Sequence, residues 1–287
     1  MIIFFNVRYT ECFCLMMIDT DDIMNIGLKL VGWKRIPADS AIHVKGRKIN
    51  RVLIAVDVTS AELILAKNLG CDAVIAHHPL GSAAINFYKV IDRHIEFMVE
   101  HGVPPDKAED RVKNLKNRIE IKNHAHIYND VVDAARIIGM PLVNIHQPCD
   151  EYVRKRILDK INAGNHDLVL DVVESIEDIP EFRNAETRIK VAHGSPKNKC
   201  GRWVLVIAAG TNGGFPIAKA YFEHEISTVI YLHIDYNDLR KIYEENLKGN
   251  LIVLGHLAGD SIGLNALADR LEDKGIETIR LGIISPK

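Results

Sequence analysis

The sequence has no Cys-x-x-Cys pair, and its few cysteines are odd in number and scattered along the chain. Such a set provides neither a disulfide framework nor a thiolate zinc site, and it fits a protein of a reducing compartment. We therefore expect a cytoplasmic protein whose functional groups are not thiols. The five cysteines are Cys12, Cys14, Cys71, Cys149 and Cys200.

The chain also lacks an excess of basic residues. It has 36 Lys and Arg against 38 Asp and Glu, which gives a formal net charge of -2. Binding to a nucleic-acid backbone relies on clustered positive charge, so nucleic acid is not expected as a partner.

No uninterrupted apolar run is long enough to cross a bilayer. Residues 1–22 are rich in apolar side chains, but Arg8 and Glu11 interrupt them, and they have neither a charged leader nor a small-residue cleavage site. We expect a ragged amino terminus and no membrane partner. Three methionines are alternative starts of the chain: Met16, Met17 and Met24.

What the sequence does contain is a βαβ unit. Residues 51–56 form a β-branched run, residues 60–69 carry apolar side chains at helical spacing, and residues 73–76 form a second buried strand. In open α/β sheets, ligands bind beyond the carboxyl ends of the strands. Those ends hold Asp57 and the His77-His78 pair, of which one imidazole is free to reach a ligand or metal. The alternative is that one ring bonds a backbone carbonyl while the other faces solvent.

Later strands end in similar side chains. Residues 141–145 are followed by a His-x-x-x-Asp spacing, and residues 251–254 are followed by another. This spacing puts both side chains on one face of a helix that begins at or before the histidine. Counting these pairs, the candidate metal ligands are His77, His78, His146, Asp150, His256 and Asp260.

The residue types of this set indicate which metals fit. Imidazole and carboxylate without thiolate favour zinc, iron, manganese or nickel. Two ions about 3.5–4 Å apart would share a bridging water and lower its pKa. Any one of these residues alone is better explained as structural, and their joint occurrence at three strand ends argues for a site. Asp57 and His233 are outlying candidates for proton transfer.

A glycine-rich loop at residues 209–214 follows a buried strand and opens a helix. It could hold an anion at the helix N-terminus, but it lacks the Lys-Ser/Thr of a phosphate-binding loop and the dinucleotide spacing. Tight packing between strand and helix is the preferred interpretation. The charged stretch at residues 106–122 is expected to be a solvated helix rather than a binding surface. We also expect a helical region over residues 86–101, a strand and turn over residues 167–179, and a last helix over residues 261–271.

Several of these segments together resemble the signature of the NIF-three-like proteins (NGG-one interacting factor three), also named type-two GTP cyclohydrolase homologues. The resemblance runs from about Ile26 to the end of the chain. The segments are Asp57-Val58-Thr59, the run from Gly70 through His77-His78-Pro79 to Leu80, His146-x-x-x-Asp150, and Gly255-His256 with a carboxylate at Asp260.

The resemblance implies an α/β fold of two domains with mixed sheets flanked by helices, a ring-shaped hexamer, and a dinuclear metal site facing the inner cavity. We place the domains at residues 18–150 and 151–287, with the last His-x-x-x-Asp segment returning to the metal site. The implied ligands of two divalent transition-metal ions are His77, His78, Asp150, His256 and Asp260, with His146 supporting them.

Two departures from the family pattern stand out. The family usually has Glu where this chain has Asp260, and the segment between His78 and His146 looks longer than usual. With the shorter Asp260 side chain, direct and water-mediated ligation are both open, and we expect the second ion to bind more weakly.

Two functions are compatible with these features. The first is a metal-dependent hydrolase acting on a C–N or phosphate-ester bond of a small molecule, with GTP cyclohydrolase activity implied by resemblance only. The alternative is a non-catalytic metal-binding, metal-delivery or scaffold protein. An open coordination position beside a substrate pocket would favour the first, and a saturated site without a pocket would favour the second.

Overall fold

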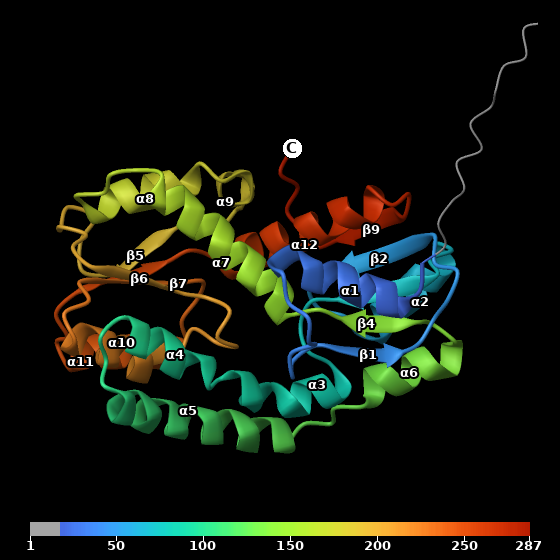
Figure 1. The fold of residues 1–287 in the computed structure, drawn as a ribbon, viewed down its shortest axis with the longest axis horizontal. Coiled ribbons are helices and arrows are strands. Elements are labelled where there is room, and N and C mark those ends of the chain that lie inside the picture. Colours follow the sequence, from blue (N-terminus) through green and yellow to red (C-terminus); the bar gives the residue numbers. More distant parts are fainter. Residues whose placement is uncertain (1–17) are drawn as a thin grey trace, which may run out of the picture.

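The computed structural model describes residues 18–287 and contains two β-sheets, each in its own lobe (Figure 1). The ragged amino terminus that we expected, including Met16 and Met17, lies outside the described residues. The chain enters the first lobe through helix α1 (Thr20–Val31), in which Met24 is buried. Among the described helices, none combines the length and apolar character needed to cross a membrane.

The first sheet has five strands in the order β1-β4-β3-β2-β9, and only β1 runs antiparallel to its neighbour. Because β3 and β4 are parallel and adjacent, the residues that follow them meet at one edge of the sheet. The strands are β1 (Ala41–Val44), β2 (Arg51–Ala55), β3 (Ala73–Ala76), β4 (Leu142–Asn144) and β9 (Glu277–Leu281).

Helices cover both faces of this sheet. Successive side chains of a strand point to opposite faces, so Val52 and Ile54 of β2 pack against α1 and α12 while Leu53 and Ala55 pack against α2 and α6. Burial on both faces is typical of a parallel sheet. These helices are α2 (Ser60–Asn68), α6 (Asp130–Ile138) and α12 (His256–Glu272), in addition to α1.

The second sheet has four strands in the order β5-β8-β7-β6, and only β5 is antiparallel to its neighbour. One face packs against α7, α8 and α9, and the other against α4, α5, α10 and α11. The strands are β5 (Lys190–His193), β6 (Trp203–Val206), β7 (Thr228–Tyr231) and β8 (Asn250–Val253). The helices are α4 (Arg93–Glu100), α5 (Pro105–His124), α7 (Gln147–Asn162), α8 (Val169–Glu177), α9 (Pro180–Asn184), α10 (Gly214–Glu223) and α11 (Tyr236–Glu244).

Each lobe contains segments from both halves of the chain. Helices α4 and α5 precede residue 150 but pack on the second sheet, whereas β9 joins the first sheet at the end of the chain. Helix α7 crosses between the two lobes in Figure 1. The division into domains at residue 150 stays a prediction, while the α/β class with mixed sheets flanked by helices is confirmed.

The helical region expected over residues 86–101 is confirmed: it follows α3 (Gly81–Asn86) and consists of a 3-10 turn at Phe87–Val90 and α4. Two other expectations are wrong. The strand and turn over residues 167–179 form helix α8, whose buried residues Val169, Val172, Val173 and Ile176 recur at helical spacing. The last helix begins at His256, five positions before the expected start.

Candidate metal centre

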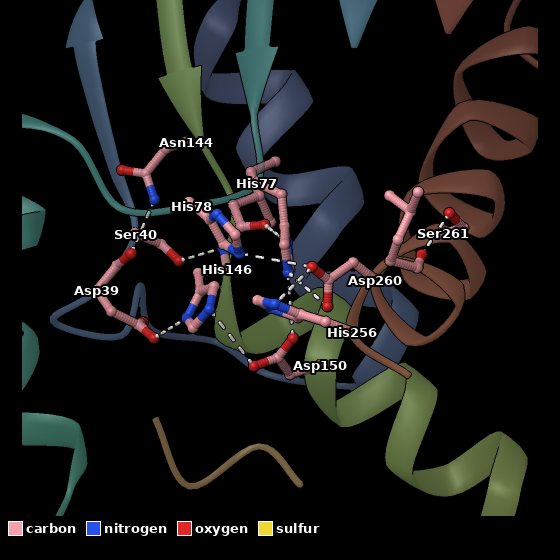
Figure 2. Close-up of polar contacts among 12 residues, drawn as sticks. Asp39, Ser40, His77, His78, Asn144, His146, Asp150, His256, Asp260 and Ser261 are labelled. Carbon is pink, nitrogen blue, oxygen red and sulfur yellow. Dashed lines mark hydrogen bonds and ion pairs between the residues drawn. The ribbon is translucent and has the colours of Figure 1, made fainter. Parts of the chain in front are cut away.

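The six candidate ligands converge from three segments of the chain. Strands β3 and β4 end beside each other, and the first turns of α7 and α12 meet at the same place. Figure 2 shows the side chains facing a common centre. They are His77 and His78 after β3, His146 after β4, Asp150 in the first turn of α7, and His256 and Asp260 in the first turns of α12.

The β2–β3 pairing fixes the backbone of the two adjacent histidines. The His77 backbone N–H donates to the Ala55 carbonyl at 2.9 Å, and the His78 N–H donates to the Val56 carbonyl at 3.0 Å. Because successive side chains diverge, His77 is fully buried and the His78 side chain is 27% exposed. Both rings nevertheless reach the centre.

Three of the imidazoles are oriented by the same arrangement. In each, Nδ1 donates to an oxygen atom, so Nε2 is turned toward the centre and has a free lone pair whenever the ring is neutral. Holding one ring nitrogen in this way is how proteins orient histidines that bind a metal. The acceptors are the Ile145 carbonyl for His77 (3.2 Å), the Asp57 carboxylate for His78 (2.7 Å) and the Asp39 carboxylate for His146 (2.7 Å).

Two buried carboxylates lie among these Nε2 atoms. Asp260 places Oδ2 at 3.2 Å from His256 Nε2 and 3.5 Å from His78 Nε2, and places Oδ1 at 3.7 Å from His77 Nε2. Asp150 lies 3.3 Å from His77 Nε2 and 3.6 Å from His146 Nε2. Each carboxylate therefore joins at least two of the imidazoles.

These residues fit a metal ion. Their ligand atoms form three overlapping groups, in each of which the atoms lie within 4.8 Å of one another. Within the described residues, the buried atoms His77 Nε2 and Asp260 Oδ2 have no hydrogen-bond partner, which is costly unless a cation or proton occupies the site. The groups are His77-His78-His146, His78-His256-Asp260 and His77-Asp150-Asp260.

The centre also shifts the pKa values of its members. Burial opposes the charged form of His77, but the Asp260 and Asp150 carboxylates outweigh it and raise the pKa of His77 well above its ordinary value. Burial likewise opposes ionisation of Asp260, yet His77 and His78 lower the pKa of that carboxyl. Without a metal, the cluster therefore retains positive charge as bound protons.

His233 lies beside the centre and not in it. Its ring is 4.2 Å from the His256 ring between centroids. Burial and the adjacent His256 lower the pKa of His233 to about 4, so its imidazole is neutral at physiological pH. The unprotonated His233 ring can accept a proton from a group bound next to the centre, and its lowered pKa makes it a weak base.

Asp57, the other outlying candidate, contacts the centre through His78. Its side chain is 79% exposed and accepts the His78 Nδ1–H bond. Asp39, which was not among the candidates predicted from the sequence, accepts the equivalent bond from His146 and is fully buried. No local pattern marks Asp39, because its contact with His146 depends on the pairing of β1 with β4.

The centre is open to a cavity of about 400 Å³. Its wall combines candidate ligands with apolar side chains, including Phe87, Ile207 and Leu232, and with the glycine-rich loop at residues 209–214. A second cavity of about 430 Å³ reaches His78, His256 and Asp260 from the side of Asp57 and Glu62. A small molecule can therefore approach these residues.

Comparisons with known proteins agree with this architecture. A NIF3 superfamily protein from Sphaerobacter thermophilus is 39% identical, and its crystal structure matches with a TM-score of 0.89 over 92% of this chain and 98% of that chain. A Pyrococcus horikoshii protein named GTP cyclohydrolase 1 type 2 homolog is 23% identical over 267 residues, which cover 91% of this chain and 96% of that protein. The structure of a Thermus thermophilus protein, TTHA1606, shares the fold at 17% identity, with a TM-score of 0.52 over 92% of this chain and 98% of that chain.

The family model described as Duf34/NIF3 (NGG1p interacting factor 3) matches residues 41–285. That range contains all six candidate ligands and both sheets. The family expectation drawn from the strand-end motifs is confirmed, and the chain belongs to the Duf34/NIF3 family.

Proposed function

We propose that this chain binds two divalent transition-metal ions and uses them to hydrolyse a bond of a small molecule. The observation that carries the proposal is the convergence of three Nε2 atoms, whose rings are held through Nδ1, on two buried carboxylates. Zinc, iron, manganese and nickel suit such a nitrogen and oxygen donor set.

The overlap of the ligand groups supports two ions rather than one. Asp260 belongs to the group with His77 and Asp150, which is fully buried, and also to the group with His78 and His256, which is nearer to solvent. A carboxylate shared in this way could serve either group, so Asp260 would be the ligand that the two groups have in common. His146 belongs to a third group and contacts Asp150, so it stands at the edge of the inner ion's site.

When bound, a pair of such ions supplies Lewis acidity and lowers the pKa of water at the site. The chain's own residues supply proton transfer and hold the histidines in position. His233 provides a neutral imidazole on the cavity wall for proton transfer. Asp57 and Asp39 are positioning residues that hold His78 and His146 in the tautomer with Nε2 free.

The open cavity favours hydrolysis over metal storage or scaffolding. About 400 Å³ of space borders His78, His256 and Asp260, as a substrate pocket would. The Pyrococcus relative's name, GTP cyclohydrolase 1 type 2 homolog, supports hydrolysis of a C–N bond, and a phosphate ester is the other bond that this chemistry serves.

A substrate panel tests the proposal. Full-length protein is assayed on C–N and phosphate-ester substrates after elemental analysis, with and without the metal found. Hydrolysis that needs the metal and is lost in Asp260→Asn supports the proposal. A metal-loaded protein that turns over none of the panel favours the non-catalytic alternative. The ring-shaped hexamer stays a prediction, which light scattering tests against six times the chain mass of 32.2 kDa.

A further inference from the structure

A third cavity, of about 480 Å³, adjoins the one at the metal centre. The two share lining residues from α5, the glycine-rich loop and the end of β7. A molecule that lies in one can therefore extend into the other. The shared residues are Lys122, Thr211, Asn212 and His233.

The walls of this third cavity, here called the basic cavity, carry three cationic side chains. Arg118 and Lys122 lie one turn apart near the end of α5, and Lys241 approaches from α11. Among residues 18–287, neither Lys122 nor Lys241 has a carboxylate within 4.0 Å. Their charges are therefore available to a bound anion.

Two acidic residues also line the basic cavity, and each has a contact within the protein. Asp235 caps α11 by accepting a bond of 2.8 Å from the Asn237 N–H. Asp238 is buried and lies 3.7 Å from the Arg118 guanidinium. Its carboxylate also lies close to Gly214 at the start of α10, so that helix end has an anion of its own. The cationic character of the open part rests on Lys122 and Lys241.

We propose that the basic cavity binds a phosphate group of the substrate, and that the substrate is a phosphorylated small molecule. This inference rests on the proposed function, which places the bond that is hydrolysed at the metal centre, in the neighbouring cavity. Cations from two helices that line one cavity suit a multiply charged phosphate better than a single carboxylate. Lys122 stands where the two cavities meet, so it links phosphate binding to the metal centre.

The position of the phosphate limits which bond of the substrate can reach the metal centre. A phosphate held by Lys122 and Lys241 is outside the group of residues that face the metal centre. The bond presented to the metals is then a different one, which favours C–N hydrolysis on a phosphorylated substrate over hydrolysis of the phosphate ester itself.

Calorimetric titration with inorganic pyrophosphate tests the basic cavity. The full chain is first freed of metal with chelator and dialysed, so that no ion can bind the probe. The variants are Lys122→Gln, Lys241→Gln and the double variant. Lys113→Gln is the matched control, because Lys113 is exposed on the opposite side of α5, nine positions before Lys122. Arg118 is left in place because it contacts the buried Asp238.

We expect each single variant to raise the Kd for pyrophosphate about fivefold and the double variant roughly 25-fold. Lys113→Gln should change it less than about twofold. Absence of wild-type binding, equal weakening by Lys113→Gln, or unchanged binding in the double variant would overturn the inference.

The metal content of the double variant separates this inference from the proposed function. Unchanged metal content with weakened pyrophosphate binding supports a distinct anion site. If the wild type binds no metal but the lysine variants still lose pyrophosphate, the proposed function fails and the basic cavity stands.

Discussion

Gly263 of α12 lies directly against Cys149 of α7. A Cβ atom at position 263 would lie 2.8 Å from the Cys149 carbonyl oxygen and 3.0 Å from its carbonyl carbon, closer than packed atoms allow. The two helices can approach this closely because residue 263 has no side chain. Asp150 in the first turn of α7 and Asp260 in the second turn of α12 lie near this contact, so the close approach brings the two carboxylates to the same imidazole, His77.

Substituting Gly263→Ala should therefore affect both stability and metal binding. The added methyl must push α12 away from the α7 backbone, and overpacking of this kind costs about 1–3 kcal/mol. We expect the free energy of unfolding to fall by that amount and metal affinity to fall at least tenfold. Arg270→Ala, on the exposed side of α12, should stay within about 0.5 kcal/mol of wild type. If Gly263→Ala is destabilised but binds metal with unchanged affinity, the contact between α7 and α12 does not determine the geometry of the metal centre.

The stability of the metal-free chain should fall as the pH rises from 6.5 to 8.5. The pKa of His77 is raised by its carboxylate neighbours, so the stability gained from its proton is complete below the unfolded value of 6.5 and is lost as the pH rises through the folded value. Histidines with lowered pKa values, such as buried His94, also contribute to stability, but that contribution is lost only as the pH falls below about 6.5. Urea unfolding at several pH values measures the effect.

The Asp260→Asn variant is the control for that titration. It removes the carboxylate that is the main cause of the raised His77 pKa, so its stability should depend less on pH over the same range. A metal-free wild type that becomes more stable toward pH 8.5 would contradict the assignment.

His78→Ala should remove metal and leave the fold intact. The His78 side chain is partly exposed, and its partner Asp57 is mostly exposed, so little packing depends on either. We expect loss of at least one ion per chain, with the metal-free variant within about 1 kcal/mol of the metal-free wild type. His126→Ala, an exposed histidine outside the centre, should retain its metal. An unfolded His78→Ala would instead make the residue structural.

The strand-end residues could be predicted from the sequence because their signals are local. A short β-branched run and the polar residue that follows it are contiguous, so His77, His78 and His146 could be placed without knowing the rest of the fold. The spacing of His256 and Asp260 likewise indicated a common helix face, which α12 provides.

Other features depend on contacts that no local pattern records. Asp39 supports His146 across 107 positions, through the antiparallel pairing of β1 with β4. The early start of α12 was missed because its N-cap, Gly255, has a φ of +120° and no capping side chain. The helical spacing of α8 was present in the sequence, but its many β-branched residues favoured a strand.

Elemental analysis of the wild type and Asp260→Asn, both purified without chelator, tests the central claim most directly. Asp260 belongs to two of the three ligand groups, and Asn removes its charge while keeping its size. Asp273 is exposed and follows the last residue of α12, so Asp273→Asn controls for the loss of one carboxylate outside the centre. We predict two transition-metal ions per wild-type and Asp273→Asn chain, and at most one per Asp260→Asn chain. One ion or fewer per wild-type chain, or equal content in wild type and Asp260→Asn, would contradict the assignment of a dinuclear centre with Asp260 among its ligands.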